Sequence, residues 1–213
     1  MTTSTAPPSP QAVDRSDFRT IMLSGAKVGL VTAVVVLVYS ALYRATPAGL
    51  AREVIESVVV LAAATLVSFL PAHWVAARGT DGIAAAAAVG LWGTVVFMAI
   101  DIAVLRPANH FFTIYPWTWD AVGGLSTWWY LPIWWMLGTF VAWMGGMLVA
   151  GRAARGESNP TLPRVAVPVV AGAALIAVIG RIAGFPVMLP ITAGAGFALT
   201  LTVLAVAAVA RKA

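Results

Sequence analysis

Six long apolar runs constrain the fold of this chain more than any other feature of the sequence. Each run is roughly 20 residues long, and a helix of that length crosses a hydrocarbon core of about 30 Å at about 1.5 Å per residue. We therefore predict an all-α integral membrane protein, a bundle of six transmembrane helices with a long aromatic outer loop between helices 3 and 4. The predicted spans are residues 21–43, 54–76, 83–105, 132–150, 165–183 and 188–210.

The composition favours the same fold class. Only 10% of the 213 residues are charged and 61% are apolar, whereas soluble domains carry about 25% charged residues. So few charges cannot cover a water-soluble globule with polar surface. The chain has no cysteine, which excludes disulfides and cysteine-ligated metals. We expect a flexible, Ser/Thr/Pro-rich cytoplasmic tail at residues 1–18 and a single six-helix domain at residues 19–213.

Lysine and arginine are distributed unevenly between the two ends of the predicted bundle. If the N-terminus is cytoplasmic, nine basic residues lie on the inner side and four on the outer side. The positive-inside rule therefore predicts that both termini are cytoplasmic and that the protein lies in the inner (plasma) membrane. The inner residues are Arg15, Arg19, Lys27, Arg78, Arg152, Arg155, Arg164, Arg211 and Lys212, and the outer ones are Arg44, Arg52, Arg106 and Arg181.

The segment from residue 101 to residue 146 holds seven of the nine tryptophans. Indole rings prefer the membrane–water boundary, where the ring contacts lipid and the N–H contacts water. We expect an aromatic belt along the outer boundary, with stacking on a pigment, quinone or lipid tail as the alternative. Trp143 lies deeper in the fourth span and could pack against a neighbouring subunit or an apolar cofactor. The seven are Trp117, Trp119, Trp128, Trp129, Trp134, Trp135 and Trp143.

Acidic residues and one histidine gather on the predicted outer face. Asp101 lies about one turn inside the third span, where an unpaired carboxylate is unfavourable. We expect ion pairs that hold loops to helix ends, with Asp101 meeting Arg106 or Arg181. A metal ion bound by Asp101, His110 and Asp120 is a weaker hypothesis, because the sequence lacks HExxH or any paired-histidine spacing. The ion-pair or translocation candidates are Asp101, Arg106, Arg181, Glu53 and Glu56.

These features indicate a non-enzymatic subunit or scaffold of a membrane assembly. The spans contain few polar residues and many small ones, which allow membrane helices to pack closely. One alternative is a small permease or channel with Asp101, Thr94 and Arg181 on the path. Another is a membrane enzyme whose outer-face carboxylates and histidine bind a metal or transfer protons. The sequence resembles no known family and identifies no cofactor. The expected partners are the lipid bilayer and other membrane subunits or copies of the chain, not nucleic acid.

Overall fold

The computed structural model describes residues 14–105, 130–157 and 160–210, and no strand occurs in this part of the chain. Its long helices are α1 (Phe18–Ala45), α2 (Leu50–Trp74), α3 (Thr80–Ile100), α5 (Tyr130–Ala153), α6 (Leu162–Ile182) and α7 (Leu189–Ala210). A short π-helical turn, η1 (Asp101–Leu105), continues α3. The structure has six helices that are long and apolar enough to cross a membrane. This confirms the predicted multi-pass helical bundle; the predicted aromatic loop lies outside the described residues.

Five of the six long helices begin two to four residues earlier than the predicted spans, and α2 and α5 are the two in which this matters most. α2 begins at Leu50, so Arg52 and Glu53 belong to its first turn and not to a loop ahead of it. α5 begins at Tyr130, which places Pro132 in its first turn. A proline there forfeits no helical hydrogen bond, because the first N–H groups of a helix have no partner within it. The early start of α2 fixes its first charged side chains on a rigid element.

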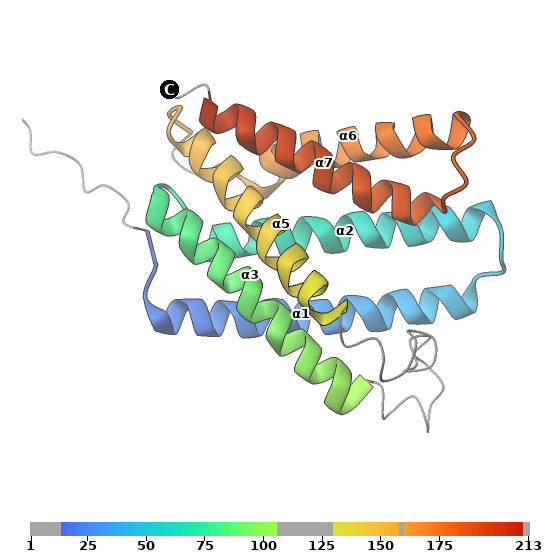
Figure 1. Ribbon diagram of the computed structural model, residues 1–213, viewed down its shortest axis with the longest axis horizontal. Coiled ribbons are helices and arrows are strands. Elements are labelled where there is room, and N and C mark those ends of the chain that lie inside the picture. The colour runs from blue at the N-terminus through green and yellow to red at the C-terminus, as the bar shows by residue number, and fades with distance from the viewer. Residues whose placement is uncertain (1–13, 106–129, 158–159, 211–213) are drawn as a thin grey trace, which may run out of the picture.

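Successive helices run in opposite directions, and α2 lies at the centre of the bundle (Figure 1). α2 contacts each of the other five long helices. Around it, α1 packs on α3, α3 on α5, α5 on α7 and α7 on α6. Both ends of the described chain lie at one end of the bundle, which we call the terminal end. We call the other end, where α1 passes to α2 and α6 to α7, the hairpin end.

Glycines allow the backbones of α1 and α3 to meet. A Cβ atom on Gly29 would lie 2.9 Å from the carbonyl oxygen of Gly93, and one on Gly93 would lie 3.2 Å from that of Gly25. Gly25 and Gly29 have the i, i+4 spacing of membrane-helix contacts, which places both on the same face. The glycines therefore bring the two backbones close together and also accommodate the side chains of Trp92, Val96 and Val28.

The same kind of contact joins α5 to α3 and to α2. A Cβ atom on Gly90 would overlap the Ala142 side chain and lie 2.7 Å from the carbonyl oxygen of Gly138. On the other side of α5, Gly145 faces the carbonyl oxygen of Ser68 so closely that any side chain would overlap it. Close backbone approach maximises van der Waals contact, which is the main force between helices in lipid.

Two helices end in the same capping motif with different residues at its left-handed position. At the end of α2, the N–H of Ala77 donates to the carbonyl of Ala72 at 2.9 Å and the N–H of Ala76 to that of His73 at 3.2 Å. This Schellman pattern requires a left-handed residue, and Ala76 has φ +52°. At the end of α6 the same pattern places Gly184 at φ +73°. A Cβ atom is unfavourable in this conformation, so α2 ends with local strain that α6 avoids.

Candidate functional site

Charged and aromatic side chains gather at the hairpin end, where α1 ends and α2 begins. The Arg52 guanidinium carbon lies 3.9 Å from the centroid of the Tyr43 ring, and its Nε lies 3.3 Å from Glu56 Oε1. Tyr39 interacts with Glu56, and the Tyr39 and Tyr43 rings stack with centroids 6.4 Å apart. We call these four residues the Tyr–Arg–Glu cluster. It joins the last turns of α1 to the first turns of α2.

Glu56 is the innermost member of the cluster. Its side chain is 6% exposed, and a buried carboxylate is stable only when a positive charge and hydrogen bonds compensate its lost hydration. Arg52 supplies the charge from one turn earlier on the same helix, through an ion pair without hydrogen-bond geometry, and Tyr39 approaches Glu56 from α1. The Tyr43 ring accepts the guanidinium face through a cation–π contact. All four groups are thus engaged with one another.

A second ion pair joins α2 to α6. Arg181 Nη1 lies 3.9 Å from Glu53 Oε2, and the Arg181 side chain is 55% exposed. A long and solvent-accessible pair of this kind contributes about 0–1 kcal/mol. Glu53, Glu56 and Arg181 were predicted from the sequence as ion-pair candidates, and the structure gives each of them an oppositely charged partner within 4.0 Å.

Asp101 begins the π-helical turn η1 and is 4% exposed. Its N–H bonds the carbonyls of Phe97 and Met98, which continues the helix into the wider turn. Single π turns inside helices occur frequently at functional sites. Of the two predicted partners, Arg106 lies outside the described residues and Arg181 contacts Glu53. Asp101 is thus a buried carboxylate at the point where α3 passes into η1.

The other predicted site residues divide into two groups. Trp135 and Trp143 lie on the surface of α5, 39% and 46% exposed. Within the described ranges, no group of three or more His, Cys, Asp or Glu side chains could bind a metal ion. The predicted metal set includes two residues beyond those ranges and stays a prediction. The structure does not describe the remaining predicted residues or their side chains, which are Arg106, His110, Trp117, Trp119, Asp120, Trp128, Trp129 and Trp134.

At the terminal end, Asp14 fixes the segment before α1 to the turn between α2 and α3. Its Oδ1 accepts the N–H of Arg78 at 2.7 Å, and its Oδ2 accepts those of Gly79 at 3.0 Å and Gly82 at 2.9 Å. Gly82 lies in the first turn of α3, and Gly79 and Arg78 directly precede that helix, so Asp14 acts as a helix cap supplied from a distant part of the sequence. The last part of the 1–18 segment thus makes specific contacts with the bundle.

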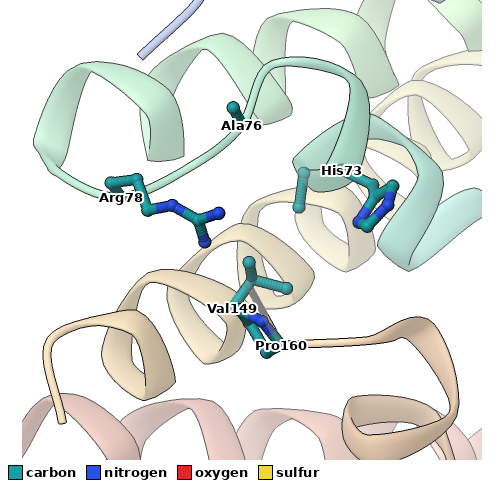
Figure 2. A pocket seen from close by; sticks show the side chains of 6 residues that line it. His73, Ala76, Arg78, Val149 and Pro160 are labelled. Atoms are coloured by element: carbon teal, nitrogen blue, oxygen red, sulfur yellow. The ribbon is translucent and has the colours of Figure 1, made fainter. Parts of the chain in front are cut away.

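A small pocket lies beside this turn (Figure 2). Its volume is about 100 Å³, enough for roughly three water molecules at about 30 Å³ each. The side chains of His73 and Arg78 extend toward it from opposite sides, and Val149 and Pro160 form its floor. The left-handed residue Ala76 reverses the chain between the two basic residues. Three separate segments, the end of α2, α5 and the start of α6, thus build one basic pocket.

Comparison with known proteins finds no match: no protein-family model, no curated protein and no solved structure is significantly similar to this chain.

Sequence reasoning missed three features of these sites. The i, i+4 spacing of Arg52 and Glu56 could have indicated their pairing, because such residues face each other on a helix. The cap made by Asp14 and the pocket between His73 and Arg78 depend on tertiary contacts. No local pattern in the sequence signals either of them.

Proposed function

We propose that this chain is a non-enzymatic, multi-pass membrane protein that acts as a packing subunit or scaffold in a membrane assembly. The glycine contacts among α1, α3 and α5 support this role, because helices locked backbone to backbone form a rigid platform. The first charged residues of α2 are engaged in ion pairs within the chain. We further propose that the protein lies in the inner (plasma) membrane with both termini cytoplasmic, on the basis of its lysine and arginine distribution.

The exposure of Trp143 near the middle of a membrane helix is the observation that carries this proposal. Trp143 lies near the middle of α5, its side chain is 46% exposed, and Met136 two turns earlier on the same side is 71% exposed. Lipid tails offer no acceptor to an indole N–H at that depth. A helix of another subunit supplies both an apolar surface and an acceptor. Trp143 is therefore the position at which we expect a neighbouring subunit to contact the bundle.

Site-specific photo-cross-linking tests this contact. A photoreactive amino acid replaces Trp143 in one variant and Leu175, which is 60% exposed on α6, in a matched control. We expect a single protein adduct of defined mass from position 143 and lipid adducts from position 175. A second copy of the chain or a different subunit would each give such an adduct, and the mass separates them. Lipid adducts alone at both positions would contradict the assembly role.

A small permease or channel is the second candidate, and the burial of Asp101 in a π-helical turn favours it. Carboxylates inside membrane helices commonly mark ion or proton paths. Of the other two residues expected on such a path, Thr94 donates its hydroxyl to the carbonyl of Gly90 and Arg181 is 55% exposed and contacts Glu53, so this candidate rests on Asp101. Proton or ion flux into liposomes containing the purified protein, measured for the wild type and for Asp101→Asn, distinguishes transport from packing.

A further inference from the structure

The pocket at the terminal end has the chemistry of an anion site. Arg78 carries a permanent positive charge with five N–H donors, and His73 offers at least one N–H donor in either charge state. Both side chains extend into the same cavity of about 100 Å³ (Figure 2). Among the residues that the structure describes, no carboxylate lines this cavity; its other walls are Ala72, Ala76, Val149 and Pro160. An anion placed there would meet donors on two sides and apolar surface below.

Three of the acidic residues at this end have structural contacts elsewhere. Asp14 accepts three backbone N–H groups at the start of α3. Asp17 caps α1 by accepting the N–H of Thr20 at 2.9 Å. Glu157 lies 4.0 Å from Arg152. These contacts direct negative charge away from the cavity, while the terminal end as a whole is rich in arginine and lysine.

The pocket lies at a depth that other side chains identify as a membrane boundary. Trp74, the residue after His73, has the Lys27 ammonium 5.7 Å from its ring centroid. A lysine that extends along a helix to meet an indole is typical of the zone where lipid tails give way to head groups. His73 itself is exposed at the end of α2. The pocket therefore opens where the phosphate groups of a bilayer lie.

From this placement we propose that the pocket formed by His73 and Arg78 binds the phosphate group of an anionic membrane lipid. Arg78 forms charge-assisted hydrogen bonds with the phosphate oxygens, and His73 donates a further hydrogen bond from the opposite wall. The cavity is too small for a whole lipid, so the acyl chains remain along the apolar outer surface of the bundle. Basic pockets between membrane helices are known to bind such head groups.

Native mass spectrometry of the full chain in detergent tests the proposal. Phosphatidylglycerol is titrated into the wild type and two variants, Arg78→Gln and His73→Phe, and the half-saturating concentration is measured. We expect Arg78→Gln to raise that concentration about tenfold, because a charge-assisted hydrogen bond is lost. We expect His73→Phe, which keeps the ring without its donors, to raise it less. Arg155→Gln, an exposed arginine at the same end, serves as the matched control and should change it less than about twofold.

Two further arms separate this site from general attraction between charges. Phosphatidylcholine, which carries a phosphate but no net charge, should bind more weakly and show no dependence on Arg78. Inorganic phosphate at matched ionic strength distinguishes a free anion from a lipid: binding of phosphate with no gain from phosphatidylglycerol would overturn the lipid assignment. Equal phosphatidylglycerol binding by the wild type and Arg78→Gln would overturn the site itself. If Arg78→Gln fails to fold, Arg78→Lys and His73→Phe are compared with the wild type instead. We expect Arg78→Lys to bind phosphatidylglycerol more weakly than the wild type, without losing binding completely.

Discussion

The guanidinium of Arg52 lies over the ring of Tyr43, its central carbon 3.9 Å from the ring centroid. Arg52 stands at the start of α2 and Tyr43 at the end of α1, so one side chain bridges the turn between two membrane helices. The same guanidinium approaches Glu56 through its Nε at 3.3 Å. One cation therefore stabilises an aromatic face and a buried carboxylate at once, and its removal affects both.

We expect Arg52→Gln to lower the free energy of unfolding by about 3 kcal/mol, because Glu56 would be left buried without a counter-charge. The free energy of unfolding of Arg52→Lys should lie between those of the wild type and Arg52→Gln, since an ammonium keeps the charge but loses the guanidinium contact with Tyr43. The double variant Arg52→Gln, Glu56→Gln should recover much of the loss. Thermal unfolding of the purified protein in detergent measures all three. Equal stability of Arg52→Gln and the wild type would show that Glu56 does not depend on Arg52.

Replacing the left-handed residue after α2, Ala76, should increase stability instead of reducing it. Ala76→Gly should raise the free energy of unfolding by about 0.5–1 kcal/mol, because φ +52° is unfavourable for alanine and accessible to glycine. Gly184→Ala, at the equivalent position after α6, should lower it by about 1 kcal/mol. Both expected signs are opposite to the usual preference for alanine over glycine, so both report the left-handed backbone conformation. A loss of stability in Ala76→Gly would show that the Ala76 methyl group makes a contact that outweighs its strain.

The contact between α3 and α5 should be intolerant of a single methyl group. Gly90→Ala places a Cβ atom against Ala142 and 2.7 Å from the carbonyl oxygen of Gly138, and we expect a loss of about 1–3 kcal/mol from overpacking. Gly194→Ala in α7 is the matched control. Its Cβ atom would meet only Val60 Cγ1, at an ordinary 3.4 Å, and we expect no loss. Similar losses in the two variants would indicate a general effect of alanine and not the close approach of α3 and α5.

Asp101 separates the two candidate functions. If it has a structural role, Asp101→Asn should lower the free energy of unfolding by about 1–3 kcal/mol, because the neutral amide keeps the shape of the carboxylate but loses its charge-assisted interactions. Glu157→Gln at the terminal end, where the side chain is 38% exposed, should have little effect. Unfolding midpoints and liposome flux are measured on the same preparations. An Asp101→Asn protein with wild-type stability and abolished flux would favour the permease over the scaffold.

The membrane orientation can be tested because the chain has no cysteine of its own. Ala48→Cys lies in the exposed turn between α1 and α2, and Ala154→Cys lies in the exposed turn after α5, at the other end of the bundle. We expect a membrane-impermeant thiol reagent to label intact cells at position 48 and only permeabilised cells at position 154. Labelling of intact cells at 154 alone would reverse the predicted orientation.

The sequence was sufficient to predict the helices and their number. Each span is long and apolar enough for a bilayer, and this requirement is local, so it can be read one segment at a time. Small residues such as Gly90, Gly138 and Gly145 also lie at helix contacts, as their abundance predicts. The order in which the helices pack around α2 could not be predicted, because neighbouring faces of apolar helices have similar compositions.

The partners of the charged residues were harder to predict than their positions. Arg181 was expected near Asp101, but it contacts Glu53, since α6 packs beside α2 and its last turn ends close to the first turn of α2. The sequence did not indicate that Tyr39 and Tyr43 contact charged residues of α2, because tyrosines near the end of a membrane helix are also expected in an interfacial aromatic belt. The pocket at His73 and Arg78 depends on how Pro160 and Val149 approach from distant segments.

The central position of α2 has a consequence for how the protein is made. α2 is the second helix to be synthesised, yet its neighbours include α5, α6 and α7, which emerge last from the ribosome. Until they are inserted, the face of α2 that carries Ser68 has no protein to contact. Glu53 likewise meets Arg181 only once α6 is in place. Glu56 has no such delay, because Tyr39, Tyr43 and Arg52 all precede it along the chain. The newly inserted α1–α2 hairpin therefore contains one complete polar contact while the rest of the bundle is still being translated.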